Sequence, residues 1–203
     1  PFGVTMLASR GEVMSGAMRS ARDIIGDQRE SFAFTRFGIV ADRRFGPVSL
    51  TLGSEMLNEE RTVLGAYLHE SFGGRGAQSV FVDGTAALNL GDGWRVGAEG
   101  RMGMTRALSG GLIAEGSRFR SVGYSMDVGK RGVLQDADRL GFRLSSPLRV
   151  TSGGLNFDLP VSFDYATESA EFALRRVSLA PDGHEMMGEL AWRGRALDGM
   201  LAA

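Results

Sequence analysis

The sequence predicts an all-β protein, an antiparallel up-and-down β-barrel of about 12 strands with one N-terminal amphipathic helix. Three observations lead to this fold class. Apolar and polar residues alternate along several long segments, as they do in strands with one apolar and one polar face. Short Gly-, Asp- and Pro-containing turn signals separate these segments. The chain of 203 residues contains 30 glycines and no cysteine, a composition that suits strands and turns without disulfides.

Residues 9–27 are the one segment with a helical pattern. Ser9 followed by Glu12 is a capping-box signal, and apolar residues then recur at helical spacing on one face. We expect residues 1–30 to form a linker and helix, and residues 31–203 to form the barrel domain. The helix would pack on the main sheet, dock against a protein partner, or enter the barrel lumen.

From Phe32 to Lys130 the pattern is one of strands and turns. The clearest unit begins with the alternating segment from Val80 to Leu90. The turn Gly91-Asp92-Gly93 joins this segment to a second alternating segment that starts at Trp94. The two segments therefore predict a β-hairpin with charges on its polar face.

The most regular alternation runs from Arg139 to Tyr165. Apolar residues mainly occupy even positions up to Val150 and odd positions from Leu155 onward. A two-residue turn at Ser152-Gly153 would place both apolar sets on one face of a long hairpin. The predicted register pairs Val150 with Leu155, Leu148 with Phe157, Leu144 with Val161 and Phe142 with Phe163. Pro147 and Pro160 lie inside these strands, so we expect bulges there or a hairpin at the sheet edge.

Strand length suggests what the apolar face contacts. Strands that cross a bilayer need about 9–11 residues, whereas soluble strands usually have about 5–6. In a transmembrane barrel the apolar face would meet lipid and the polar face would line the lumen; the alternative is a long hairpin over a soluble core. The residues expected to face the lumen are Arg95, Glu99, Arg101, Asp127, Arg139, Arg143, Asp158 and Asp164, and those expected to face lipid are Trp94, Phe142, Leu148, Phe157, Phe163 and Trp192.

Motifs for catalysis and ligand binding are not found in the sequence. The spacing of His69 and His184 does not supply a catalytic triad. The chain has neither cysteines nor paired histidines to bind a metal, and we interpret Asp136 and Asp138 as a solvated turn. Residues 73–76 lack the Lys and Ser/Thr of a phosphate loop, and a net charge of −1 gives no electrostatic reason to expect nucleic acid. We expect no catalytic, cofactor-binding or metal-binding residues and no peptidase or esterase activity.

Several short motifs together resemble a known family. The chain resembles the C-terminal region of alphaproteobacterial subtilisin-like serine peptidases that carry an autotransporter-type β-barrel, over roughly residues 45–195. The motifs are Glu60-Arg61-Thr62-Val63-Leu64-Gly65, Gly91-Asp92-Gly93-Trp94, Asp138-Arg139-Leu140-Gly141-Phe142-Arg143, Leu159-Pro160-Val161-Ser162-Phe163-Asp164-Tyr165-Ala166 and Leu179-Ala180-Pro181.

The resemblance implies a bacterial outer-membrane translocator or anchor that contacts outer-membrane lipid. Its own N-terminal passenger would carry the peptidase activity. Such barrels end in a strand closing on Phe or Trp, whereas this chain stops at Leu201-Ala202-Ala203. We therefore expect one or two closing strands to be missing.

Two functions follow from these observations. The long alternating strands favour a membrane-embedded translocator or anchor. The N-terminal helix and the strand prolines favour a soluble β-rich accessory module, secreted or periplasmic, that binds or stabilises an attached peptidase.

Overall fold

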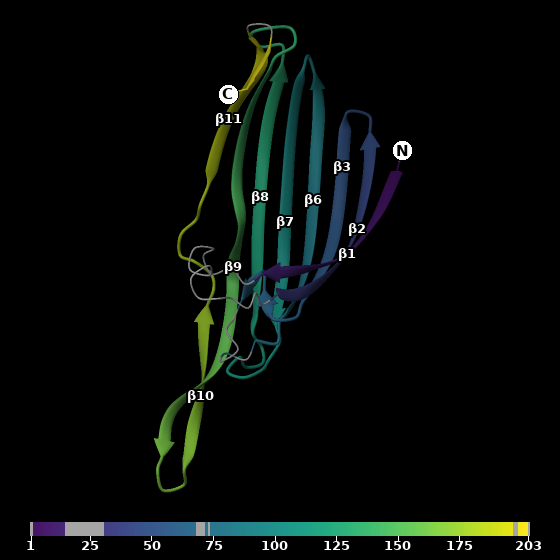
Figure 1. Ribbon diagram of the computed structural model, residues 1–203. Coiled ribbons are helices and arrows are strands. Elements are labelled where there is room, and N and C mark those ends of the chain that lie inside the picture. Colours follow the sequence, from purple (N-terminus) through teal and green to yellow (C-terminus); the bar gives the residue numbers. More distant parts are fainter. Residues whose placement is uncertain (1, 15–30, 68–71, 73, 197–198, 203) are drawn as a thin grey trace.

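A computed structural model describes residues 2–14, 31–67, 72, 74–196 and 199–202, and most of these residues lie in β-strands (Figure 1). The predicted all-β, antiparallel class is confirmed. Within these residues, ten strands form the main sheet and two short strands form a separate hairpin. The main sheet contains β1 (Phe2–Met14), β2 (Ser31–Phe45), β3 (Val48–Glu59), β6 (Ala77–Gly91), β7 (Trp94–Ala107), β8 (Arg118–Arg131), β9 (Arg139–Asp164), β10 (Ser169–Ser178), β11 (Met187–Ala196) and β12 (Gly199–Ala202); the separate hairpin contains β4 (Thr62–Val63) and β5 (Ala66–Tyr67).

The main sheet is an up-and-down meander, and its described strands do not close into a barrel. Its strand order is β1-β2-β3-β6-β7-β8-β9-β11-β12, and β10 pairs with the distal part of β9. Among the described residues, β1 pairs only with β2 and β12 only with β11. The described strands therefore form an open wall rather than the predicted closed barrel, and the β9–β10 hairpin projects beyond it (Figure 1).

The predicted N-terminal helix is wrong for the part of it that the structure describes. Residues 9–14 belong to β1, which pairs with β2 from Phe2↔Arg43 to Met14↔Ser31. Residues 15–27 of the predicted helix lie outside the described residues. Pairing with β2 satisfies the backbone of residues 9–14 and overrides their local helical pattern. No helix in the described part of the chain is long and apolar enough to cross a membrane.

The hairpin predicted around the turn at residues 91–93 is confirmed. β6 pairs with β7 from Ala77↔Ala107 to Gly91↔Trp94, and Asp92 and Gly93 adopt the positive φ angles of 47° and 81° that a tight turn requires.

The hairpin predicted around Ser152-Gly153 is wrong. β9 runs without a turn from Arg139 to Asp164. Val150 pairs with Ser121 of β8, and Leu155 pairs with Val177 of β10. The register between β8 and β9 shifts at Arg120/Ser121 and again at Val122/Tyr124. The shift at Arg120/Ser121 leaves Thr151 as an extra residue on β9, and this bulge accounts for the phase reversal that the sequence attributed to a turn.

Both strand prolines lie beside irregularities, as their positions within strands predicted. Pro147 lies opposite the Val122/Tyr124 shift, and Pro160 pairs with Phe172 next to the shift at Glu171/Phe172. Proline has no N–H to donate, so it is tolerated where the ladder is already interrupted.

The turns of the meander define two ends of the sheet. We call the end with the β2–β3, β6–β7 and β8–β9 connections the upper rim, and the end with residues 60–67 and 108–117 the lower rim (Figure 1). A small apolar core occupies the lower rim, where Ile113 and the β4–β5 hairpin contact the sheet. The core contains Val63, Ala77, Ala107, Ile113, Phe119 and Leu155, with Val150 and Phe157 packed against it.

Candidate functional site

The main sheet presents two chemically different faces. Residues that pair directly across strands share a face, so the register identifies the members of each. The polar face carries Glu55 of β3, Arg101 of β7 and Arg143 of β9. The apolar face carries Val82 of β6, Met102 of β7 and Phe142 of β9.

The apolar face carries a band of exposed apolar side chains, which is interrupted by the exposed Arg43 of β2 and Arg120 of β8. Members include Leu52, Met104 and Met126, which are exposed at 67%, 65% and 62% although they are large and apolar. Monomeric soluble proteins rarely expose contiguous apolar patches of more than a few hundred Å². The band on β1 to β9 contains Phe2, Val4, Met6, Phe37, Ile39, Phe45, Leu50, Leu52, Met56, Val80, Val82, Trp94, Val96, Met102, Met104, Tyr124, Met126, Phe142 and Leu144.

A row of polar residues ends the band near the lower rim. Adjacent strands pair these residues directly, in the order Arg10, Thr35, Asn58, Gln78, Arg106 and Arg118. The row crosses six strands on the apolar face.

A second row ends the band near the upper rim and is rich in tryptophan. Trp94, Lys130, Leu140 and Trp192 pair directly across β7, β8, β9 and β11. The Lys130 ammonium lies 4.9 Å from the centre of the Trp94 ring. Tryptophan and lysine together are typical of the boundary between hydrocarbon and water in membranes.

The distance between the two boundary rows matches a bilayer. On β7 the apolar-face positions between Trp94 and Arg106 are Val, Ala, Gly, Met and Met. At about 3.3 Å per residue, this stretch of strand is roughly 40 Å long. If the strand is tilted by about 45°, this length spans roughly 28 Å along the membrane normal. The hydrocarbon core of a bilayer is about 25–30 Å thick.

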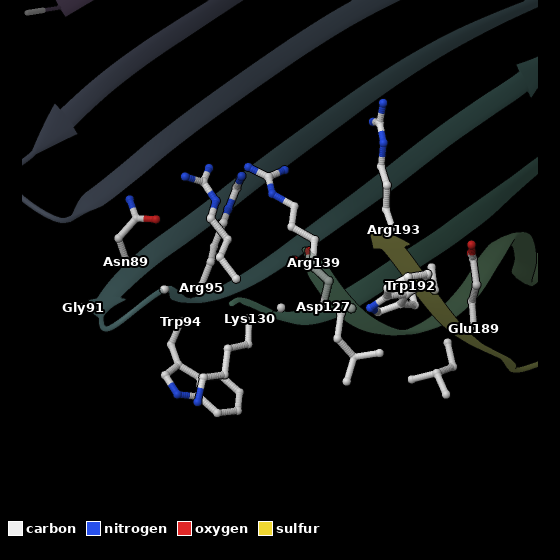
Figure 2. A pocket seen from close by; sticks show the side chains of 17 residues that line it. Asn89, Gly91, Trp94, Arg95, Asp127, Lys130, Arg139, Glu189, Trp192 and Arg193 are labelled. Carbon is white, nitrogen blue, oxygen red and sulfur yellow. The ribbon is translucent and has the colours of Figure 1, made fainter. Parts of the chain in front are cut away.

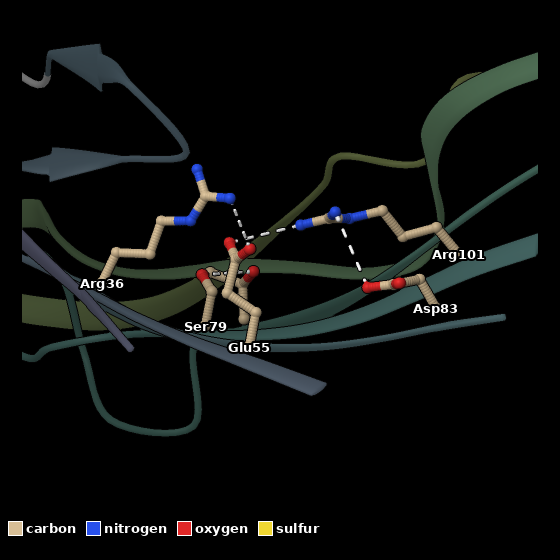
Figure 3. A network of polar contacts seen from close by, with 6 residues as sticks. Arg36, Glu55, Ser79, Asp83 and Arg101 are labelled. Atoms are coloured by element: carbon tan, nitrogen blue, oxygen red, sulfur yellow. Dashed lines mark hydrogen bonds and ion pairs between the residues drawn. The ribbon is translucent and has the colours of Figure 1, made fainter. Parts of the chain in front are cut away.

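The polar face is organised by ion pairs between strands (Figure 3). The Glu55 carboxylate lies 2.9 Å from Arg36 of β2 and 3.3 Å from Arg101 of β7, and Arg101 also lies 3.9 Å from Asp83 of β6. The Glu55 side chain is only 12% exposed. The largely buried Glu55 carboxylate therefore links β2, β3 and β7, and Arg101 extends the link to Asp83 of β6.

A second group of polar contacts connects the strands closer to β9. Arg143 forms an ion pair with Glu99 of β7, and its guanidinium donates a hydrogen bond of 2.9 Å to Ser125 Oγ of β8. Mixed charges thus continue across the polar face from β2 to β9.

Most residues that the sequence assigned to the lumen lie together on the polar face: Arg95, Glu99, Arg101, Asp127, Arg139 and Arg143. Trp94, Phe142 and Trp192, assigned to lipid, lie together on the apolar face.

The assignments on the distal part of β9 need correction, because they relied on the wrong hairpin. Phe157 packs against the lower-rim core and Phe72, whose ring lies 6.2 Å away, so it does not belong to the apolar band. The bulge beside Pro160 places Phe163 on the same face of the β9–β10 hairpin as Asp158, and Asp164 on the other. Leu148 lies in the bulge opposite Gly123.

The upper rim contains a hollow of about 770 Å³ that is lined by residues of β6, β7, β8, β9 and β11 (Figure 2). Arg95, Arg139 and Arg193 point to one side of these strands, and Trp94 and Lys130 point to the other (Figure 2). The alternation in the sequence predicted Arg95 and Arg139 as polar-face residues but carried no signal for Arg193 beside them, because β11 pairs with β9 only in the folded sheet.

Asp138 holds the upper-rim loop between β8 and β9. It is fully buried, and its carboxylate accepts hydrogen bonds from the backbone N–H groups of Val133 (2.7 Å) and Leu134 (2.9 Å) and from Trp192 Nε1 (2.8 Å). The interpretation of Asp138 as part of a solvated turn is therefore wrong. Burial raises the pKa of this carboxyl, but hydrogen bonds from Trp192, Val133, Leu134 and Gln135 lower it, and the net pKa lies below its ordinary value.

We expect the Asp138→Asn variant to have a lower melting temperature than the parent at neutral pH. A carboxyl whose pKa is lower in the folded state stabilises the fold above its unfolded pKa of about 3.9, and this stabilisation is lost as pH falls through the folded value. The difference between variant and parent should therefore shrink below about pH 4. Melting curves across pH measure this, with Asp136→Asn as the exposed control. A difference that does not change with pH would contradict the expectation.

A serine and a histidine that the sequence analysis did not connect lie in contact. Ser146 Oγ and His184 Nε2 are 2.9 Å apart, and the His184 ring packs edge-on against Tyr124. A catalytic serine needs a histidine that a third group orients. No described carboxylate contacts His184, and Ser146 is only 4% exposed, so the pair lacks the geometry of a triad. The other candidate, His69, lies outside the described residues.

Together the fold and the site define a class of protein: an antiparallel β-wall with one ion-paired polar face and one exposed apolar face. The described residues contain no group of three or more side chains suited to hold a metal ion. No protein-family model, no curated protein and no solved structure matches the chain.

Proposed function

We propose that this chain is the wall of a bacterial outer-membrane β-barrel that anchors or translocates an attached serine peptidase. The observation that carries the membrane part is the apolar band between a polar row near the lower rim and a tryptophan-rich row near the upper rim. The ion-paired polar face is the surface expected of a barrel lumen. The peptidase passenger and the outer-membrane location rest on the resemblance of the sequence motifs.

In a membrane, both edges of the sheet would need strand partners. A bilayer core contains no water to satisfy backbone N–H and C=O groups, so open edges do not occur there. The outer edges of β1 and β12, which lack strand partners among the described residues, would pair with each other or with further strands in the membrane.

One observation favours the second function, a soluble secreted module that binds or stabilises an attached peptidase. The segment between β10 and β11 has no ladder pairing, although His184 in it reaches Ser146 at the middle of the apolar band. Irregular backbone at this depth is not tolerated where it faces lipid.

Thiol labelling distinguishes the two functions, because the chain contains no native cysteine. Met126→Cys places a thiol in the apolar band, and Thr85→Cys places one on the exposed polar face. In lipid vesicles we expect a lipid-soluble maleimide, but no charged reagent, to label Met126→Cys. The charged reagent should label Thr85→Cys.

The cysteine-free parent controls for non-specific labelling. If the charged reagent labels Met126→Cys, and the purified chain stays monodisperse without detergent, the membrane proposal fails and the soluble module is favoured.

A further inference from the structure

Three arginines stand side by side at the upper rim of the polar face. Arg131 pairs with Arg139 across β8 and β9, and Arg139 pairs with Arg193 across β9 and β11. Neighbouring strands lie about 4.7–4.9 Å apart, so the backbone positions of the two outer arginines are only about 10 Å apart. Like charges placed directly opposite each other in a sheet are destabilising.

A fourth arginine and a floor of small residues extend this cluster. Arg95 lies in the adjacent row of the polar face, which continues through Gly129, Gly141 and Ala191. These small residues line the hollow of about 770 Å³, together with Trp94, Lys130, Leu140 and Trp192 of the opposite face. Figure 2 shows Arg95, Arg139 and Arg193 extending on the same side of the strands.

The protein does not neutralise this cluster with its own carboxylates. Arg36, Arg101 and Arg143 all form ion pairs, but none of the four upper-rim arginines has an ion pair or side-chain hydrogen bond within the described part of the chain. Two acids, Asp127 and Glu189, also line the hollow, one row further from the rim, and both pair with the Arg143 position. Four arginines and two carboxylates leave a net charge of +2 on this part of the polar face.

We propose that the upper rim of the polar face binds the phosphate groups of a multiply charged ligand, with Arg139 at the centre of the site. Guanidinium groups match phosphate oxygens in bidentate geometry and stay charged at any physiological pH. A ligand with several negative charges would relieve the repulsion between the arginines of the row. A single carboxylate would relieve this repulsion only in part. The site does not depend on insertion of the chain into a membrane.

The phosphate groups have two possible sources, a soluble polyphosphate and a phosphorylated lipid headgroup. The arginine row is adjacent in sequence to the Trp94–Lys130–Leu140–Trp192 row on the opposite face. If that row lies at a membrane boundary, the arginines lie at headgroup level.

Binding of sodium pyrophosphate to the full chain, measured by isothermal titration calorimetry, tests the soluble source. Flotation with phosphatidylcholine vesicles, with and without a minor fraction of phosphatidic acid, tests the lipid source. We expect Arg139→Gln to weaken binding by about ten- to a hundredfold, the loss of a charge-assisted contact. The control Arg176→Gln removes an exposed arginine on the β9–β10 hairpin and should leave binding unchanged.

The outcomes separate the sources and can overturn the site. Pyrophosphate binding that depends on Arg139 supports the site with a soluble ligand. Binding to phosphatidic acid alone, again dependent on Arg139, supports it with a lipid headgroup. No binding in either assay, or equal binding by Arg139→Gln and Arg176→Gln when circular dichroism shows both variants folded, overturns the proposal.

Discussion

The Val82→Arg variant is expected to unfold in lipid vesicles with a free energy about 2–4 kcal/mol lower than that of the parent chain. Val82 lies in the apolar band, where it pairs with Ser54 of β3 and Met102 of β7, and it is 48% exposed. If lipid covers the band, an arginine there must bring its charge into hydrocarbon. Denaturant unfolding followed by the fluorescence of Trp94 and Trp192 measures the change.

Thr85→Arg is the matched control for Val82→Arg. It adds the same charge to the same strand, but on the polar face and directly opposite Glu99. We expect its free energy of unfolding to stay within about 1 kcal/mol of the parent value, as for most surface substitutions. Equal, small effects of both substitutions would mean that water rather than lipid covers the apolar band.

The second large effect is expected for Gly153→Ala, which should lower the free energy of unfolding by about 2–5 kcal/mol. Gly153 has a φ angle of 91°, which a residue with a Cβ adopts only under strain. A Cβ at this position would lie 2.3 Å from the Arg118 carbonyl oxygen and 2.6 Å from Phe119 Cα. Both contacts are with the backbone of β8, so no side chain can rotate away to relieve them.

Gly100→Ala separates this local effect from the general effect of replacing a strand glycine. Gly100 lies in β7, and a Cβ there would have no atom within 4 Å. Its melting temperature and free energy of unfolding should change little, within about 1 kcal/mol. If Gly153→Ala is as stable as Gly100→Ala, then the backbone of β8 does not lie as close to residue 153 as described above.

Three features needed knowledge of the strand partners. A phase reversal at Ser152-Gly153 fits both a turn and a bulged strand, and only the pairing of Val150 with Ser121 decides for the bulge. Residues 9–14 have a helical pattern, but β2 pairs with them. The contact of Ser146 with His184 joins residues 38 positions apart and has no local signal.

The sequence by itself determined the all-β class, the hairpin of β6 and β7, and the face on which Arg95, Glu99 and Arg101 lie relative to Trp94. These properties are local, because side chains alternate along any one strand whatever its neighbours are. Only the tertiary structure decided the open edges, the course of β9, and the row of Arg131, Arg139 and Arg193. These properties depend on which distant segments pair and in what register, and free energy gained across strands rather than along them selects that pairing.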